Sequence, residues 1–189
     1  IATDGGGSGG VVYDVLTDLS VENLSNGGDY KSVTAGTSNL VLGVNAGNSI
    51  ASGGNYNVAV GDEAGTALTT GDGNVAIGFE ALTTEDAHGN NTAVGYRTLK
   101  VLNAGAEGYN TAIGFDAGLA ITTGVQNTIV GGLAGDAITT GDYNVGVGVH
   151  AVGSTTTADG NTAIGYNAMF ANTTGASNTA VGRNALDAN

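Results

Sequence analysis

The 189-residue sequence contains no cysteine, no proline, no tryptophan and a single methionine. Without cysteine, neither a disulfide framework nor a thiolate metal site can form. Large core-forming side chains are scarce, whereas glycine alone accounts for 35 residues and Ala, Val, Thr and Asn fill most other positions. Such a composition does not suit a globular core, but it suits coils stacked so closely that small residues fill them.

Basic residues are also few, with four Lys and Arg against 17 Asp and Glu and a formal net charge of −13. Phosphate binding requires a basic surface, so nucleic acid is not expected as a partner. No run approaches the roughly 20 apolar residues that cross a bilayer, and no basic-then-apolar leader opens the chain. We therefore expect no membrane insertion of this segment.

The pattern Asn-x-x-(Val/Ile/Leu)-Gly recurs nine times, and successive copies start 18, 17, 17, 19, 17, 17, 17 and 17 residues apart. A near-constant period that tolerates short insertions is typical of a stacked coil, because extra residues bulge from one corner. We predict an all-β fold, a parallel β-solenoid or β-roll of nine coils over residues 38–189. Residues 1–37, which include the glycine-rich stretch Asp4–Gly10, are expected to form a linker, connector or cap.

Two columns of the repeat define its structure. Asn opens each unit, where we expect a turn with left-handed backbone geometry and an amide bonded to the same amide one coil away. Gly closes each strand, which predicts a corner with positive φ or a neighbouring backbone too close for a Cβ. The columns are Asn39, Asn57, Asn74, Asn91, Asn110, Asn127, Asn144, Asn161 and Asn178, and Gly43, Gly61, Gly78, Gly95, Gly114, Gly131, Gly148, Gly165 and Gly182.

Between Asn and Gly, strand alternation places the first and third residues on one face, as in Val75 and Ile77, and the second, such as Ala76, on the other. We expect the β-branched first and third residues to form the buried stripe. Two residues after Gly, a polar column that includes Glu80 and Asp116 is expected to face water.

The small residues of each coil predict that several chains associate. Ordering a glycine-rich coil costs much conformational entropy, and few large apolar side chains are available to offset it. Burial of one face against sister chains would supply the missing stability.

Short segments of the repeat resemble known fibrous proteins. Asn57-Val-Ala-Val-Gly61, Asn74-Val-Ala-Ile-Gly78 and Asn161-Thr-Ala-Ile-Gly165 are similar to the Ser-Val-Ala-Ile-Gly core of the head repeats of YadA-type trimeric autotransporter adhesins. The run Asn172-Thr-Thr-Gly-Ala-Ser-Asn-Thr-Ala-Val-Gly-Arg-Asn-Ala-Leu186 resembles phage tail-fibre repeats more closely, and the resemblance covers residues 38–189. It implies left-handed coils assembled as a homotrimer.

Candidate chemistry in the sequence is weak. Gly6-Gly-Ser-Gly-Gly10 matches a nucleophile elbow only formally, because no apolar strand precedes it, and His88 and His150 are not at metal-ligand spacing. We predict no enzymatic activity, no catalytic residue, no cofactor and no metal ligand. A calcium ladder would need a carboxylate on nearly every coil, so Asx turns are the preferred interpretation of Asp72, Asp142 and Asp159.

Two surface columns are candidates for ligand contact. Tyr56, Tyr109 and Tyr143 each precede a repeat Asn and could stack on a receptor sugar, or could pack against neighbouring coils. Ice binding would need a flat, exposed threonine array, and strand alternation predicts that the threonine column points inward. That column comprises Thr92, Thr111, Thr128, Thr162 and Thr179.

These features predict an extracellular or virion-surface structural protein, a fibre shaft segment similar to those of phage tail fibres, which spaces or presents a receptor-binding tip. The alternative is an adhesin head at a bacterial surface that itself binds a host glycan, protein or matrix ligand. Ice-binding and calcium-binding solenoids remain as further alternatives.

Overall fold

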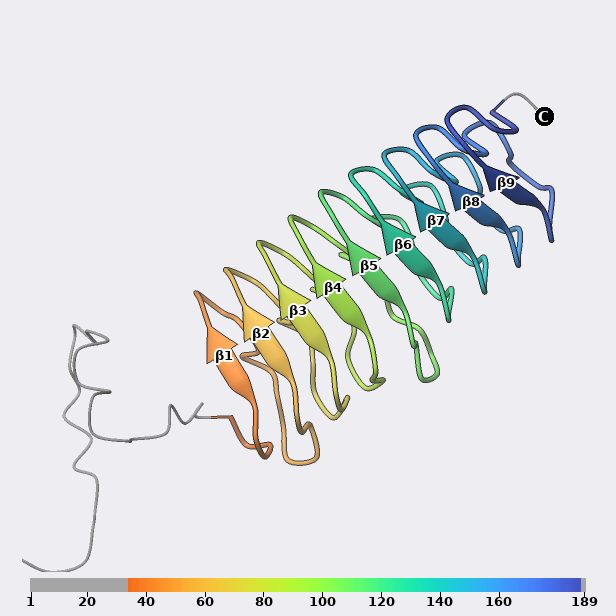
Figure 1. The fold of residues 1–189 in the computed structure, drawn as a ribbon. Helices are drawn as coiled ribbons and strands as arrows, with labels where there is room; N and C mark the ends of the chain where they lie inside the picture. The colour runs from red at the N-terminus through yellow and green to blue at the C-terminus, as the bar shows by residue number, and fades with distance from the viewer. Residues whose placement is uncertain (1–33, 188–189) are drawn as a thin grey trace, which may run out of the picture. The chain divides into compact units, whose positions relative to one another are not determined.

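The computed structural model describes residues 34–187 as a succession of short strands joined by turns. The nine strands are β1 (Leu40–Leu42), β2 (Val58–Val60), β3 (Val75–Ile77), β4 (Thr92–Val94), β5 (Thr111–Ile113), β6 (Thr128–Val130), β7 (Val145–Val147), β8 (Thr162–Ile164) and β9 (Thr179–Val181). They form one parallel sheet in chain order (Figure 1). Because each strand lies one coil beyond the last, this part of the chain is a parallel β-solenoid of about eight turns without a helix.

The predicted all-β parallel β-solenoid is therefore confirmed. The predicted connector or cap, residues 1–37, lies outside the described residues except for residues 34–37. Within the described part of the chain, no helix is long and apolar enough to cross a membrane.

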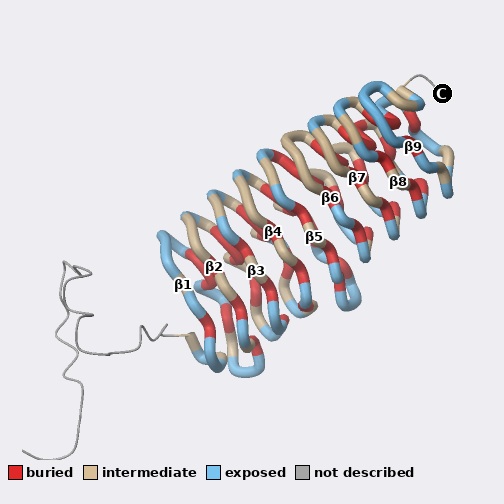
Figure 2. Tube along the Cα trace, in the orientation of Figure 1, coloured by how far each residue is buried: buried red, intermediate tan, exposed pale blue. Residues whose placement is uncertain are grey.

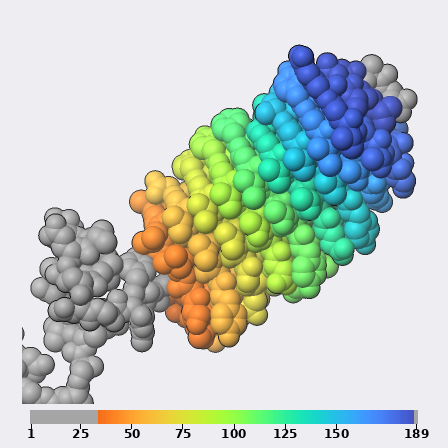
Figure 3. Space-filling model, viewed as in Figure 1, coloured from red at the N-terminus to blue at the C-terminus, as the bar shows by residue number. Residues whose placement is uncertain are grey.

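Strand register stays constant along the solenoid. Equivalent residues pair in all eight interfaces, and Thr92 pairs with Thr111 even though 19 residues separate them. The extra residues of that coil lie in the turn around Gly105, where nothing would contact an added Cβ. In the space-filling view the coils follow one another as contiguous bands (Figure 3). An insertion at a corner therefore leaves the next layer undisturbed.

The central residue of each strand faces the inside of the coil, and it is Ala in six of the nine strands and Val41, Ile129 and Gly146 in the other three. Ala76 and Ala112 are fully buried, whereas Ile77 and Ile113 are 37% and 40% exposed (Figure 2). The prediction that the β-branched first and third residues form the buried stripe is thus wrong. Behind the six strands with a central Ala, the walls of the coil lie so close together that a methyl group fills the space, whereas β6 buries Ile129 beside Gly146 of β7. Larger core side chains come from the corners: Leu68, Leu82, Leu99, Leu102, Ile121, Ile138, Val152 and Met169.

The glycine that ends each strand meets both conditions predicted for it from Gly43 to Gly165, and Gly182 in the last coil meets only that of positive φ. Its φ lies between +123° and +141° in all nine coils, a region that residues with a side chain rarely adopt. A Cβ at Gly114 would also lie 2.6 Å from the carbonyl oxygen of Gly131 in the next coil. Successive coils therefore stack backbone on backbone at this corner.

The asparagine column forms a hydrogen-bonded ladder. Each side-chain oxygen from Asn39 to Asn161 accepts a bond of 2.8–3.2 Å from the backbone N–H of the next asparagine. In most coils the Nδ2 group donates to a turn carbonyl, as Asn127 does to Gly141 at 2.9 Å. Direct amide-to-amide bonds, as predicted, occur only in some coils. The left-handed residue is the one before the asparagine, with φ of +47° to +67°, which corrects the predicted position.

The polar column two residues after glycine is a second left-handed corner, with φ of +51° to +61°. Most of its residues are exposed or half-buried, but Asp116 is only 4% exposed, so the expectation that the whole column faces water is wrong there. Arg97, in the preceding coil, forms a bidentate ion pair with Asp116. This pairing explains how a carboxylate is buried at that corner.

Candidate functional site

The outward side of the sheet is a regular surface that runs through all nine strands. The first and third residues of every strand point away from the core, and we call this surface the outer face. Most of its side chains are half-buried by their neighbours, and Leu42, Ile77, Ile113, Ile164 and Val181 are between 37% and 67% exposed. The outer face comprises residues 40, 58, 75, 92, 111, 128, 145, 162 and 179, and residues 42, 60, 77, 94, 113, 130, 147, 164 and 181. Leu, Val, Ile and Thr occupy all of these positions, so the outer face carries no charged residue.

An aromatic column follows the strand-ending glycine and extends this apolar surface. Phe79 stacks on Tyr96 and Tyr96 on Phe115, with ring centroids 5.3 Å apart in both pairs. The three rings are 42–53% exposed, and Tyr166 and Val149 occupy the same column further along the chain at 47% and 44%. Sequence reasoning did not identify this column, although aromatic residues after the glycine of adjacent units are a recognisable signal.

Two of the four basic residues form ion pairs beside the aromatic column. The Arg97 guanidinium lies 5.2 Å from the Tyr96 ring centroid, and its hydrogen bonds with Asp116 raise the pKa of Arg97. The Lys100 ammonium lies 2.6 Å from a carboxylate oxygen of Glu80. These cations are therefore locally compensated and do not form a basic patch.

The predicted receptor-contact tyrosines lie at the left-handed corner before the asparagine. Tyr56, Tyr109 and Tyr143 are 68%, 56% and 55% exposed. They belong to coils that are not adjacent, and none of the ring contacts found among the described residues joins them. Each tyrosine is accessible, but the three do not form one platform.

The threonine column lies on the outer face, which corrects the prediction that it points inward. Thr128 and Thr179 are exposed, and Thr92, Thr111 and Thr162 are half-buried. Equivalent threonines pair directly between β4 and β5, β5 and β6, and β8 and β9. The argument against an exposed threonine array therefore fails, although Val58, Val75 and Val145 still interrupt it.

The three aspartates considered for calcium act as caps on neighbouring turns. Asp72 accepts a bond from the Asn55 N–H at 2.6 Å, and Asp159 accepts one from the Asp142 N–H at 2.8 Å. Asp142 in turn accepts a bond from the Val125 N–H at 2.8 Å. Each carboxylate thus bonds the backbone of the coil before it, 17 residues away, so these contacts link successive coils and differ from the local Asx turns expected from the sequence.

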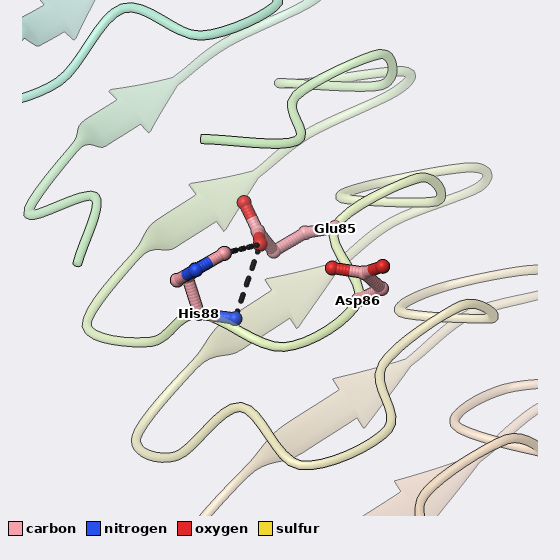
Figure 4. Close-up of side chains that lie close together, drawn as sticks. All are labelled: Glu85, Asp86 and His88. Atoms are coloured by element: carbon pink, nitrogen blue, oxygen red, sulfur yellow. Dashed lines mark hydrogen bonds and ion pairs between the residues drawn. The ribbon is translucent and has the colours of Figure 1, made fainter. Parts of the chain in front are cut away.

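One cluster of metal-ligand residue types lies between β3 and β4, where Glu85, Asp86 and His88 approach one another (Figure 4). The Glu85 side chain is fully buried, and its carboxylate accepts bonds from the Ala104 N–H at 3.1 Å and the His88 N–H at 3.3 Å. Burial raises the pKa of Glu85, an effect that these hydrogen bonds partly oppose. This cluster is not visible in the sequence as a metal motif, because it contains a single histidine and its carboxylates do not recur in other coils.

Comparison with known proteins gives no match: no family model, no curated protein and no solved structure is similar to this chain.

Proposed function

We propose that this chain is a shaft segment of an extracellular or virion-surface fibre, in which three copies pack side by side. The observation that carries the proposal is the outer face, which is uncharged over the whole length of the solenoid and is apolar except for five threonines. Contiguous exposed apolar surfaces larger than a few hundred Å² are rare on monomeric soluble proteins and usually mark an interface.

A second copy of the same chain is the partner that best fits this surface. The outer face is repetitive, so a copy aligned along the solenoid can match it coil by coil. A cyclic assembly around an axis parallel to the solenoid would cover the face in every copy and leave both ends free for further segments. The resemblance to trimeric adhesin and tail-fibre repeats implies that the assembly contains three copies and that the coils are left-handed.

The shaft function also agrees with the constant strand register. Eight steps of about 4.8 Å give a rod of about 40 Å in which all coils are tied by backbone hydrogen bonds and the asparagine ladder. Such a rod holds a receptor-binding tip at a fixed distance from its base.

A binding assay separates the shaft from the adhesin alternative. The fluorescently labelled chain is applied to bacterial cells, animal cells and a glycan array, beside a variant with Tyr56, Tyr109 and Tyr143 changed to Ser. A shaft predicts no saturable binding by either protein. Saturable binding that the triple substitution abolishes would replace the shaft with an adhesin head.

Ice binding is a second candidate, because the threonine column lies on the outer face and equivalent threonines pair between adjacent strands. The strand spacing of about 4.7–4.9 Å repeats regularly along that face, as an ice-binding surface requires. Thermal hysteresis of the purified chain tests this candidate. Ice binding predicts hysteresis that is lost in Thr111→Lys, whereas the shaft proposal predicts none in the parent protein.

A further inference from the structure

Three residues in the coil between β3 and β4 depart from their repeat columns. Glu85 occupies a buried corner position that is Ile or Leu in five other coils, namely Ile50, Leu68, Leu102, Ile121 and Ile138. Asp86 replaces a threonine found at the same position in other coils, including Thr69, Thr122, Thr139, Thr156 and Thr173. His88 replaces a small residue whose carbonyl accepts the asparagine Nδ2 bond, as in Gly71, Gly124, Gly141 and Ala158.

These three substitutions bring their functional groups together. One ligand atom from each residue lies within 4.8 Å of the other two. The Oε1 atom of Glu85 is 3.4 Å from the Nδ1 atom of His88. Nδ1 is itself inaccessible to solvent and makes no hydrogen bond that meets the geometric criteria, although it lies at ion-pair distance from the Glu85 carboxylate. A fully buried carboxylate and a buried imidazole nitrogen therefore face each other at close range (Figure 4).

We propose that Glu85, Asp86 and His88 bind a divalent transition-metal ion of the zinc type. Two ligand atoms that each lie about 2.0–2.2 Å from a tetrahedral ion are separated by roughly 3.3–3.6 Å, which matches the Glu85 to His88 distance. One imidazole and two carboxylates form a mixed N/O donor set suited to first-row divalent ions. Calcium fits less well, because it requires six to eight oxygen ligands.

Asp86 and the solvent side complete the site. Asp86 is half-buried, and its carboxylate bonds only the adjacent Ala87 N–H among the described residues, so it can turn toward the ion at little cost. The His88 side chain is 28% exposed, which leaves room for entry of the ion and for a water as fourth ligand. The ion would compensate the charge of the buried Glu85 carboxylate. This site is independent of the proposed shaft function.

Zinc titration of the complete chain tests the site, with His88→Gln as the ligand variant and His150→Gln as the matched control. His150 is the only other histidine of the sequence and lies in a different coil, where its ring packs edge-on against Phe170. We expect the parent and His150→Gln to bind one zinc ion per chain saturably by calorimetry and elemental analysis. His88→Gln should bind at least tenfold more weakly, and Asp86→Asn should also bind more weakly.

Cobalt supplies a second readout, because an imidazole and carboxylate site gives visible absorption bands that nonspecific surface binding lacks. These bands should appear in the parent and be absent from His88→Gln. Equal melting temperatures of parent and His88→Gln in chelator would show that the variant folds, so a loss of binding reports on the ligand. The proposal is overturned if the parent takes up no zinc saturably, if His88→Gln binds as tightly as the parent, or if equimolar calcium displaces zinc.

Discussion

Glycine at the end of every strand determines where each coil turns, and asparagine determines how successive coils are joined. Both columns are visible in the sequence because every unit repeats them. The remaining left-handed corners are not, since Glu80, Arg97, Leu133 and Val152 all adopt φ near +50° to +57° without being residues that favour it. At these corners, stacking against the adjacent coil imposes the backbone conformation, and the residue type does not predict it.

Three glycine-to-alanine substitutions separate strain from steric contact. Gly114→Ala combines a φ of +141° with a Cβ only 2.6 Å from the next coil, Gly182→Ala has a φ of +127° without a close contact, and Gly132→Ala has neither. We expect Gly132→Ala to change stability by less than about 1 kcal/mol. Gly182→Ala should lower the free energy of unfolding by about 1–3 kcal/mol, and Gly114→Ala should lower it further. Thermal melts monitored by circular dichroism measure the order, and equal melting of Gly114→Ala and Gly132→Ala would contradict this account of the corner.

Asn127→Ala tests the asparagine ladder. The substitution leaves two buried backbone groups without partners, the N–H of Asn144 and the carbonyl of Gly141. At about 1–3 kcal/mol for each group, the variant should lose roughly 2–6 kcal/mol. Asn178→Ala, in the last coil, removes a half-buried amide that donates to Asn161 and should cost about 1 kcal/mol. Chemical denaturation of both variants provides the comparison, and equal losses would argue against a structural ladder.

At the scale of the strand, alternation predicts that two faces exist but not which one is inside. Hydrophobicity favoured Val75 and Ile77 as the core face, yet in that strand the buried residue is Ala76. The distance between the walls of the coil determines which face of the strand is buried. That distance depends on the corners, which the sequence of a single strand does not specify. The outer face could not be predicted for the same reason, because its residues were expected to lie in the core.

Substitutions at neighbouring positions of β5 test this assignment. Ala112→Leu forces extra methylene groups into the space between the walls and should destabilise the fold by about 1–3 kcal/mol or more. Thr111→Val, on the half-buried outer face, should stay within about 0.5 kcal/mol of the parent. Denaturant titration distinguishes the two. A larger loss of stability for Thr111→Val than for Ala112→Leu would favour the original prediction that the first and third residues of the strand are buried.

For the whole molecule, the repeat period predicts the solenoid and its parallel sheet of nine strands, because both follow from one column stacking on itself. The metal cluster could not be predicted in this way. Glu85, Asp86 and His88 are departures from the repeat, and only the path of the turn brings them together. An association surface likewise depends on which strand face points outward.

A charge placed on the outer face tests that surface. Ile113→Lys introduces an ammonium at the centre of the apolar sheet, where burial between copies would leave it unpaired. We expect the variant to sediment as a smaller species than the parent. Thr123→Lys adds the same charge at an exposed corner and should assemble as the parent does. Analytical ultracentrifugation at matched concentrations measures both, and identical sedimentation of Ile113→Lys and the parent would argue that the outer face is not the interface.

Static light scattering of the unmodified chain tests the central claim most directly. The account predicts a folded species with three times the 18.3 kDa chain mass, because association covers the outer face and the resemblance to trimeric fibre repeats implies three copies. Circular dichroism on the same sample establishes that the species is folded. A folded, cooperatively melting species of 18.3 kDa would contradict the account, since the apolar outer face would then be stable in water without a partner.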